Sequence, residues 1–389
     1  MAQKKQVLFV CYGLGIGGIE KCLVNLINIL PEADFDVDVM LLNPQYNMMP
    51  QIRRNVYFYD EFEYVLYAGG AMDAIRSRGG IGKNLGKLLK LIPFRYLEQH
   101  GGAAWKLFRP INKHYDIAIA YSQNGYALYY VIDKVHATRK VLWYHNGAYE
   151  PSEKEYRLHK RYYPQFDSIV AVSRDCAAIL KEKLPFVRDK ILVLRNICDA
   201  QDIQEKAKAF CPKGFADGRV QIVTVGRMSK EKGTLLALEA CHRLVEQGYN
   251  ICWHWVGGGP EETSVQEKVK QLGLEDRFIL EGNQNNPYPF IAKADIYVQP
   301  SYYEAYSTTV TEAKVLCKPM VVTDVGGMHD QLIPGKTGLI VSVDAQAIAE
   351  GVNKLLEDVH MRDSFSKELH QSGTDFYREF TEYERTVFR

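Results

Sequence analysis

Short apolar runs rich in Val, Ile and aromatic residues alternate with longer segments of helical periodicity along the chain. This alternation predicts parallel strands joined by helices, the pattern of an α/β fold. The runs of the first half predict strands at 7–11, 37–42, 117–121, 141–144, 169–172 and 191–194. Those of the second half predict strands at 221–225, 252–256, 278–280, 296–299 and 320–323. We therefore predict two doubly wound, Rossmann-like domains, one after the other.

A polar stretch separates the two sets of strands. Residues 199–219 are enriched in Lys and Gln, contain Pro and Gly breakers and include no core-like run. We place a linker there, between a first domain at 1–198 and a second domain at 220–374. The segment 375–389 is a predicted helix whose apolar face must pack against one of the two domains. We assign it to the first domain. Four side chains form its apolar face, Phe376, Phe380, Tyr383 and Val387.

Composition narrows the function classes. The chain has 389 residues and a formal net charge of +1, so no global field indicates a nucleic-acid partner. The eight cysteines are scattered singly, without metal-site spacing, as is typical of reduced thiols. The first residues lack a signal-peptide pattern, and the longest uncharged stretch, 117–132, is too short and polar to span a bilayer. We expect a cytoplasmic protein.

A glycine-rich turn follows the first predicted strand. Gly13, Gly15 and Gly18 match G-x-G-x-x-G, in which the backbone approaches a phosphate at a helix start. An NAD(P)-dependent oxidoreductase would need an acidic residue at the end of the second strand, but Asp36 and Asp38 lie at its start, so this class is disfavoured. The same two residues spell D-x-D, a metal-binding pattern in sugar transfer. Chance occurrence is the favoured interpretation, and we expect no metal site.

Two cations follow the first strand of the second domain. Arg227 and Lys232 lie in the turn 226–233, at the carboxyl end of a parallel strand, where α/β sheets bind ligands. A guanidinium can bind two phosphate oxygens and an ammonium adds a point charge, which together suit a diphosphate. An equally supported alternative is a solvated basic loop offset by Glu231.

Two carboxylates flank the start of a later helix. Glu304 lies in the turn after strand 296–299, and Glu312 lies about one turn into the helix. The backbone amides of 307–309 would point out of the helix N-terminus between them, which predicts an anion-binding crevice lined by two acids. The alternatives are a capping box between Thr309 and Glu312 and a solvated loop charge at Glu304.

These motifs, in this order, resemble the retaining glycosyltransferases of family 4 over essentially the whole chain. The resemblance implies the GT-B fold, two facing Rossmann-like domains with a cleft between them. It also implies transfer of a hexosyl group from a nucleotide sugar to a glycan acceptor. We expect the donor to be a UDP-sugar and the acceptor to be held on a lipid carrier. The run 286–289 is similar to members that build bacterial surface polysaccharides. The matching residues are Gly17, Gly18, Glu20, His145, 171–173, 196–199, 226–227, 232–233, 257–260, Glu304, Glu312 and 326–327.

The resemblance assigns roles in the second domain. Arg227 and Lys232 would hold the donor diphosphate, Glu304 would bond hydroxyls of the donor sugar, and Glu312 would bond the ribose. No metal ion, cofactor or protein nucleophile is implied, because the cations neutralise the leaving group and the leaving phosphate takes the acceptor's proton. The rest of the donor-binding turn comprises Tyr306, Ser307 and Thr308.

In the first domain, Gly17 and Gly18 would approach the diphosphate or the acceptor, and His145 would contact the sugar near its 6-position. The chain departs from the family at two places. It has Ile197-Cys198 where Gly-Val is frequent, and Ala305-Tyr306-Ser307 where Gly-Phe-Pro is common. The larger Tyr306 would alter the donor pocket. Another GT-B activity, such as a sugar-nucleotide epimerase, or an inactive scaffold is the alternative function.

The segment 76–113 is strongly basic. It carries nine Lys and Arg side chains against Glu98 alone. Leucines at 85, 88 and 89 interleave with lysines at helical spacing, which predicts a basic amphipathic helix on an anionic membrane surface. We therefore expect peripheral attachment at the inner face of the membrane. A core-packed helix with a solvated lysine face is the alternative.

Overall fold

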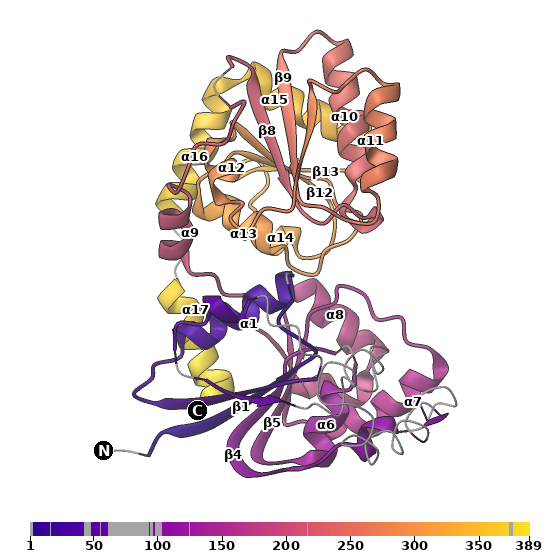
Figure 1. Cartoon of the computed structure of the whole chain (residues 1–389), viewed down its shortest axis with the longest axis vertical. Helices are drawn as coiled ribbons and strands as arrows, with labels where there is room; N and C mark the ends of the chain where they lie inside the picture. Colours follow the sequence, from indigo (N-terminus) through magenta and orange to yellow (C-terminus); the bar gives the residue numbers. More distant parts are fainter. Residues whose placement is uncertain are drawn as a thin grey trace, which may run out of the picture. The chain divides into compact units, whose positions relative to one another are not determined.

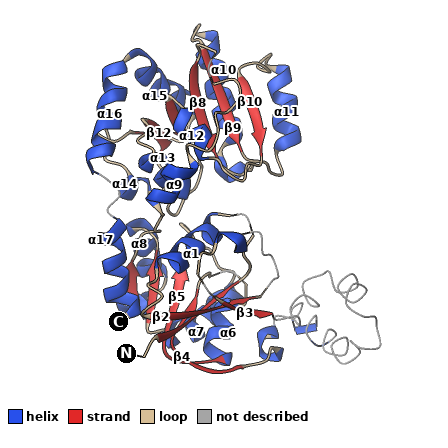
Figure 2. Ribbon diagram, turned by 60° about the vertical axis from the view of Figure 1, so that its left-hand side comes forward, coloured by secondary structure: helices blue, strands red, loops and turns tan. Residues whose placement is uncertain are grey.

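The computed structural model describes residues 3–15, 17–42, 48–54, 56–60, 93, 96–97, 103–123, 125–215, 217–372 and 376–389. The chain divides into two compact units (Figure 1). The first unit comprises Met1–Ile197 with Glu379–Arg389, and the second comprises Cys198–Arg378. Each unit is a parallel sheet with helices on both faces (Figure 2).

The sheet of the first unit has, within the described residues, the strand order β3-β2-β1-β4-β5-β6-β7. All neighbouring strands are parallel. The order reverses between β1 and β4, which is the switch point where open α/β sheets bind ligands. The strands are β1 (Lys5–Cys11), β2 (Phe35–Leu41), β3 (Tyr57–Asp60), β4 (Ile111–Ala120), β5 (Val135–Tyr144), β6 (Ser168–Ala171) and β7 (Ile191–Val193).

Helices cover both faces of this sheet. One face packs on α6, α7 and α8 through an aromatic core that includes Trp105, and the other lies against α1 and α17. The helix α7 begins with a capping box, in which Ser152 and Glu155 satisfy each other's backbone amides. The helices are α1 (Gly18–Ile29), α6 (Ala127–Lys134), α7 (Glu153–Tyr162), α8 (Arg174–Lys183) and α17 (Phe376–Tyr383), with short turns η1 (Met49–Gln51), η2 (Ala104–Leu107), η3 (Tyr163–Gln165) and η4 (Pro185–Lys190).

The second unit repeats the plan. Its strand order, β10-β9-β8-β11-β12-β13, again reverses beside its first strand, and all pairs are parallel. The central strands are largely apolar and buried along almost their whole length, because helices cover both faces. The strands are β8 (Val220–Val225), β9 (Ile251–Val256), β10 (Phe278–Gly282), β11 (Ile296–Gln299), β12 (Met320–Thr323) and β13 (Leu339–Val341).

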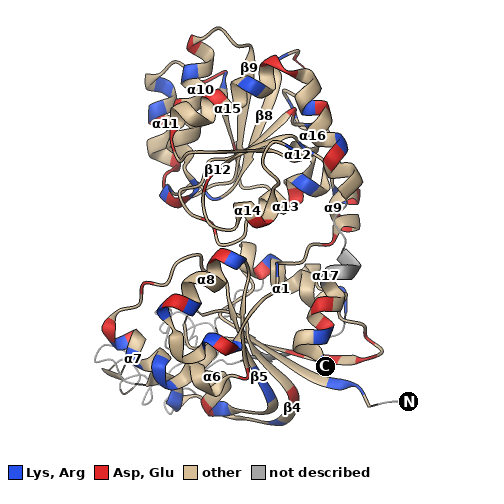
Figure 3. Cartoon of the chain, turned by 180° about the vertical axis from the view of Figure 1, so that it is seen from behind, with Lys and Arg blue, Asp and Glu red and all other residues tan. Residues whose placement is uncertain are grey.

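Two apolar clusters sandwich this second sheet. One joins it to α10, α11 and α15, and the other joins it to α9, α12, α13 and α14. Residues of both charges, Lys and Arg as well as Asp and Glu, are spread over the helices, in keeping with the near-zero net charge (Figure 3). The helices are α9 (Ala200–Lys206), η5 (Lys230–Lys232), α10 (Thr234–Glu246), α11 (Glu262–Gln271), α12 (Tyr288–Lys293), α13 (Thr308–Val315), α14 (Met328–Gln331), α15 (Ala345–Glu357) and α16 (Val359–Ser372).

The two doubly wound sheets confirm the predicted fold class. The short edge strands β3 and β13 have no counterpart in the sequence-based prediction, and β4 and β5 begin six residues before their predicted starts. The polar stretch 199–219, predicted as a linker, contains α9. This helix is capped by Asp199, which accepts a hydrogen bond from the amide of Asp202, and it buries Ile203 in the second unit.

The C-terminal segment packs on the first unit. The ring of Tyr383 packs against that of Trp143 at a tilt of 34°, with centroids 5.5 Å apart, and the Tyr383 hydroxyl donates to the carbonyl of Arg195. A π-helical turn, η6 (Glu384–Phe388), follows. Its backbone carbonyls accept hydrogen bonds from Arg139 and Lys5, so cations of β5 and β1 hold the chain end.

Candidate functional site

The turn after β8 places Lys232 at the carboxyl edge of the second sheet. Gly233 ends η5 with φ of +70°, and a Cβ there would lie 2.0 Å from the carbonyl oxygen of Pro300. Only glycine accepts both the backbone angle and this approach. The turn is therefore held closely against the residues that follow β11.

Lys232 and Glu304 form an ion pair across the switch point between β8 and β11. Nζ of Lys232 lies 2.7 Å from Oε1 of Glu304. The Glu304 side chain is 8% exposed and that of Lys232 is 25% exposed, so the pair is largely removed from solvent. The hydroxyl of Ser301 also donates to Oε1, at 2.9 Å. The carboxylate is not the solvated loop charge considered as an alternative.

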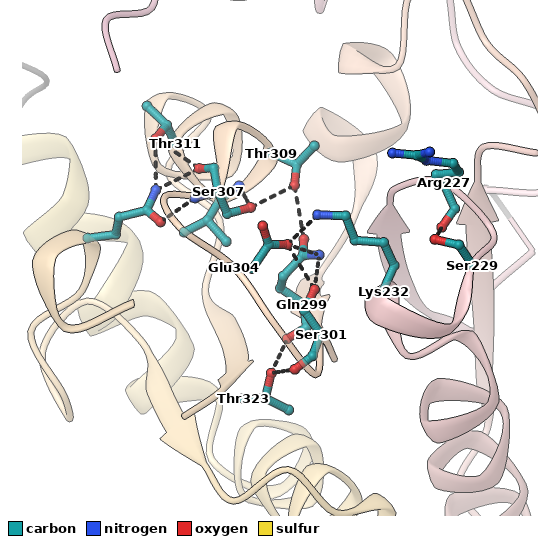
Figure 4. Close-up of polar contacts among 12 residues, drawn as sticks. Arg227, Ser229, Lys232, Gln299, Ser301, Glu304, Ser307, Thr309, Thr311 and Thr323 are labelled. Atoms are coloured by element: carbon teal, nitrogen blue, oxygen red, sulfur yellow. Dashed lines mark hydrogen bonds and ion pairs between the residues drawn. The ribbon is translucent and has the colours of Figure 1, made fainter. Parts of the chain in front are cut away.

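Ser307 caps α13 and joins it to this pair. The Ser307 hydroxyl accepts from the amide of Val310 at 3.4 Å and lies 3.1 Å from the hydroxyl of Thr309. Thr309 donates to Oε1 of Gln299, whose amide nitrogen reaches Ser301 and Glu304 (Figure 4). The N-terminus of α13 and the Lys232–Glu304 pair therefore belong to one polar network. Thr308 is the first residue of the helix and is half-buried.

Glu312 lies in the second turn of α13 and is 2% exposed. Because Ser307 is the N-cap, Thr309 is inside the helix, and the capping box of Thr309 with Glu312 is wrong. A carboxylate this far from solvent is costly unless polar groups or cations face it. Its burial favours a role for Glu312 beyond helix capping.

Arg227 is exposed on the same turn as Lys232 and lies apart from the hydrogen-bonded network in Figure 4. The exposed position of its side chain fits the alternative of a solvated basic loop. The charge of Arg227 also acts on Glu231 in the same turn. Burial alone would raise the pKa of the Glu231 carboxyl. Hydrogen bonds from its own backbone amide and from Ser229, together with the charges of Arg227 and Lys232, outweigh burial and lower this pKa. The Glu231 carboxylate is therefore held mainly by hydrogen bonds within the turn, with a smaller contribution from the two cations.

Tyr306 is 8% exposed, and Gly327 fixes the turn that contains it. Gly327 has φ of +78°, and a Cβ there would lie 2.1 Å from the carbonyl oxygen of Ala305. Ser307 is held from the same side, because Gln331 of α14 bonds both its amide and its carbonyl. The departure Ala305-Tyr306-Ser307 is thus a well-packed part of the network.

In the first unit, Gly17 is the N-cap of α1 and Gly18 is its first residue. Oε2 of Glu20 lies 2.3 Å from the position that a Cβ on Gly17 would take. A carboxylate of the chain itself therefore lies at this helix start. The backbone at Gly17 is extended, and the Glu20 carboxylate is the end of a flexible side chain, so neither feature requires glycine here.

His145 follows β5 and is half-buried against Tyr121, with ring centroids 4.8 Å apart. Burial lowers the pKa of His145 to about 3, although a hydrogen bond with the backbone of Tyr121 opposes the shift. The imidazole is therefore neutral at physiological pH. Its Nε2 atom has no hydrogen-bond partner among the described residues.

The D-x-D residues have structural partners. Asp38 is 6% exposed and accepts hydrogen bonds from Lys113 and Tyr115, both at 2.7 Å. Asp36 accepts from Gln6 at the amino end of the sheet. In the described parts of the chain, His, Cys, Asp and Glu side chains form no group of three that could hold a metal ion.

Most of the basic segment 76–113 lies outside the described residues. Of its cations, the structure describes Lys106, Arg109 and Lys113. Lys113 lies in β4 and pairs with Asp38, so this end of the segment is a strand, and its charge does not belong to an amphipathic helix. No helix of the described residues is long and apolar enough to cross a bilayer.

Sequence reasoning missed the residues that hold the ion pair in place. Gln299 and Ser301 are 1% and 0% exposed, and both contact the pair. Gln331 and Thr323 anchor the chain on either side of it. A signal for Gln299 was available, because it is the one amide in an otherwise apolar β11.

Both halves of the chain match known families. Residues 16–202 match the profile described as Glycosyltransferase Family 4, and residues 205–371 match Glycosyl transferases group 1. The chain belongs to glycosyltransferase family 4. The fold agrees with this family, because the structure of HepE from Anabaena, crystallised with UDP and glucose, superposes with a TM-score of 0.72 at 17% identity, covering 98% of this chain and 99% of that one. The two Rossmann-like units are those of a GT-B fold, as predicted.

Curated relatives of this family member include glycosyltransferases named for capsular polysaccharide and lipopolysaccharide synthesis. An N-acetylgalactosaminyltransferase of Campylobacter jejuni, named for a diphospho-undecaprenol acceptor, is 26% identical over 55% of this chain and 57% of its own. The capsular polysaccharide glycosyltransferase CapM of Staphylococcus aureus is 29% identical over 43% of each chain. The chain spans about half the length of the curated relatives it matches.

Proposed function

We propose that this family 4 member transfers a hexosyl group from a UDP-sugar to a lipid-linked glycan acceptor in the synthesis of a bacterial surface polysaccharide. The observation that carries the proposal is the Lys232–Glu304 pair at the carboxyl end of β8 and β11. A cation for a diphosphate and an acid for sugar hydroxyls lie there side by side, at the switch point of the sheet.

The second unit supplies the donor contacts. Arg227 and Lys232 bind the diphosphate, whose charge grows as the glycosidic bond breaks, so both stabilise the leaving group. Glu304 accepts hydrogen bonds from the donor sugar, and Glu312 from the ribose. The amides of Thr308 and Thr309, at the start of α13, face a phosphate, whereas the amide of Ser307 is held by Gln331.

The first unit supplies the acceptor side. His145, neutral at physiological pH, contacts the transferred sugar near its 6-position through its ring nitrogen. Gly17 and Gly18 lie at the start of α1, where backbone amides approach the diphosphate or the acceptor.

The reaction retains the anomeric configuration. The bond from the sugar's C1 to the diphosphate oxygen breaks, and the acceptor oxygen bonds C1 from the same face. The acceptor's proton passes to the departing phosphate, so no protein nucleophile is needed. Arg227 and Lys232 supply the positive charge, and a divalent metal is not required.

Two relatives support the choice of donor and acceptor. HepE of Anabaena binds UDP and glucose, and the Campylobacter enzyme is named for a lipid diphosphate acceptor. The basic segment 76–113 then attaches the protein to the anionic inner face of the membrane, where such acceptors lie. Sedimentation with phosphatidylglycerol vesicles at low and high salt tests this attachment, and binding insensitive to salt, or none, would remove it.

The first experiment is thermal unfolding with UDP, GDP, ADP, NAD and NADPH. A ligand at 100 times its Kd stabilises the folded state by about 2.7 kcal/mol, which gives a clear shift in Tm. We expect UDP to act selectively, and UDP-sugars then to be screened with lipid-linked acceptors. A shift with GDP or ADP alone would change the donor. Stabilisation by NAD or NADPH alone would overturn the proposed function.

A further inference from the structure

We propose that Gln299 is a positioning residue, which orients the Glu304 carboxylate so that Oε1 is held by the protein and Oε2 is presented to the donor sugar. The inference rests on the proposed function, because it explains how the sugar-binding acid of that site is aimed. Gln299 ends β11 and belongs to none of the motifs identified in the sequence. It would act through Glu304, without contacting the substrate.

The hydrogen-bonding capacity of the Gln299 amide is fully used. Its Oε1 accepts from the hydroxyl of Tyr297 at 2.7 Å and from that of Thr309 at 2.9 Å. Its Nε2 donates to Ser301 Oγ at 2.9 Å and reaches Glu304 Oε1 at 3.4 Å. An amide has two acceptor and two donor positions, and all four are directed at partners here. At 1% exposure, such an amide would be costly without them.

The carboxylate of Glu304 and the amide oxygen of Gln299 can only accept, and this fixes which hydroxyl donates in each bond. The Ser301 hydroxyl donates to the Glu304 carboxylate, so it must accept from Gln299 Nε2. Thr309 donates to Gln299 Oε1, so it accepts from Ser307. Every donor in this chain of bonds therefore points from the N-cap of α13 towards Glu304 (Figure 4).

All of the hydrogen bonds end on one carboxylate oxygen. Lys232, Ser301 and Gln299 converge on Oε1 of Glu304. Among the described residues, no hydrogen bond to Oε2 is found. In Figure 4 the second oxygen of Glu304 points away from Gln299 and Ser301. A carboxylate held in this way has one oxygen left to accept from a sugar hydroxyl.

The test compares the affinity for UDP with that for the UDP-sugar that the wild-type protein uses, by calorimetry. Gln299→Met keeps the volume and removes the amide. We expect the Kd of this variant for UDP to stay within about twofold of wild type. The ratio of its Kd for UDP to its Kd for the UDP-sugar should fall about tenfold. The transfer rate at saturating donor should fall by a similar factor. A general loss of packing would weaken UDP and UDP-sugar alike.

Gln221→Met is the matched control. Gln221 is 2% exposed in β8 of the same sheet, and it bonds His254, Asp217 and the carbonyl of Arg219 at the opposite end. This variant should keep the wild-type ratio of the two affinities. If Gln299→Met does not fold, the same ratio of affinities is measured on Ser301→Ala, which removes the hydroxyl partner of the Glu304 carboxylate. Ser301→Thr, which retains the hydroxyl, should recover most of the loss.

The outcomes separate two failures. If the wild-type protein binds no UDP-sugar more tightly than UDP, the proposed function fails with this inference. If wild type shows the preference and Gln299→Met keeps it unchanged, the positioning role of Gln299 is wrong while the proposed function stands. Equal losses in Gln299→Met and Gln221→Met would also overturn the role, because they would indicate a stability effect.

Discussion

Nζ of Lys232 lies 2.7 Å from Oε1 of Glu304, although 72 positions separate the two residues in the chain. The ion pair joins the first turn after β8 to the turn after β11, the two central strands of the second sheet. Glu304 holds the ammonium in place before any ligand arrives. In the proposed function, a diphosphate would meet a cation whose position is already set, so little reorganisation would accompany binding.

Replacing Lys232 with Ala should reduce the transfer rate by about 10²–10³-fold, because one preorganised donor to the leaving group is lost. It should also lower the free energy of unfolding by about 1–3 kcal/mol, since the Glu304 carboxylate stays buried without its cation. Lys230→Ala is the control, because Lys230 is exposed on the same turn. Steady-state assays and thermal melts of both variants check this, and near-normal turnover of Lys232→Ala would reject the site.

Gly327→Ala should both destabilise the second unit and reduce transfer. Gly327 has φ of +78°, and the added Cβ would lie 2.1 Å from the carbonyl oxygen of Ala305, next to Glu304. Gly335 has a similar φ of +74° with nothing within 4 Å of its Cβ position. Gly335→Ala should therefore cost about 1–2 kcal/mol from backbone strain alone.

The difference between these two variants isolates the contact with Ala305. We expect Gly327→Ala to cost about 1–3 kcal/mol more than Gly335→Ala, by analogy with overpacked cores. Its transfer rate should fall at least tenfold, roughly, because the turn that carries Glu304 must move. Chemical denaturation and activity assays measure both effects. Equal stability of the two variants would contradict the close packing of this turn.

The fold could be predicted because its signals are local. Buried strands such as β8 and β9 are rich in Val, Ile and aromatic residues and lie between helical segments, so the sequence alone locates them. The amino half of β4, from Ile111 to Asp116, is polar and half-exposed, and it is a strand because β5 pairs with it. The edge strand β13 has three residues, too few for a period to be seen.

The site could be predicted only in part. Lys232 and Glu304 stand in recognisable motifs, but their pairing depends on strand order, which brings β8 next to β11. The T-x-x-E spacing at Thr309 suggested a capping box, yet Ser307 starts the helix two residues earlier. The sequence places Lys113 in a basic surface segment, whereas in the structure its ammonium forms an ion pair with Asp38 within the sheet. Long-range partners of this kind leave no local pattern.

Glu312 should decide the preference for ribose over deoxyribose. A buried carboxylate that accepts from ribose hydroxyls should make wild type bind UDP about tenfold more tightly than 2′-deoxy-UDP or 3′-deoxy-UDP. Glu312→Gln should reduce this preference to about twofold or less while retaining the fold. Calorimetric titration with the three nucleotides measures it. An unchanged preference in the variant would remove Glu312 from the nucleotide site.

The acid side of the stability profile should depend on His145. Burial lowers the pKa of His145 in the folded state to about 3, whereas the unfolded chain titrates near about 6.5. Between these values the unfolded state binds more protons, so stability falls as the pH falls below about 6.5, by up to about 1.4 kcal/mol per pH unit from this group. Above about 6.5, neither state is protonated and the contribution vanishes.

His145→Asn should therefore lose less stability than wild type between pH 7 and pH 5, whatever its stability at pH 7. Burial also lowers the pKa of His159, to about 4, so part of the loss of stability at acid pH remains in this variant. His136→Asn is the control, because His136 is exposed on the same strand β5. Hydrogen exchange of β5 peptides at the two pH values reports the unfolding of the first unit. Parallel profiles for wild type and His145→Asn would show that His145 becomes protonated in the folded protein, which would contradict the neutral state of its imidazole.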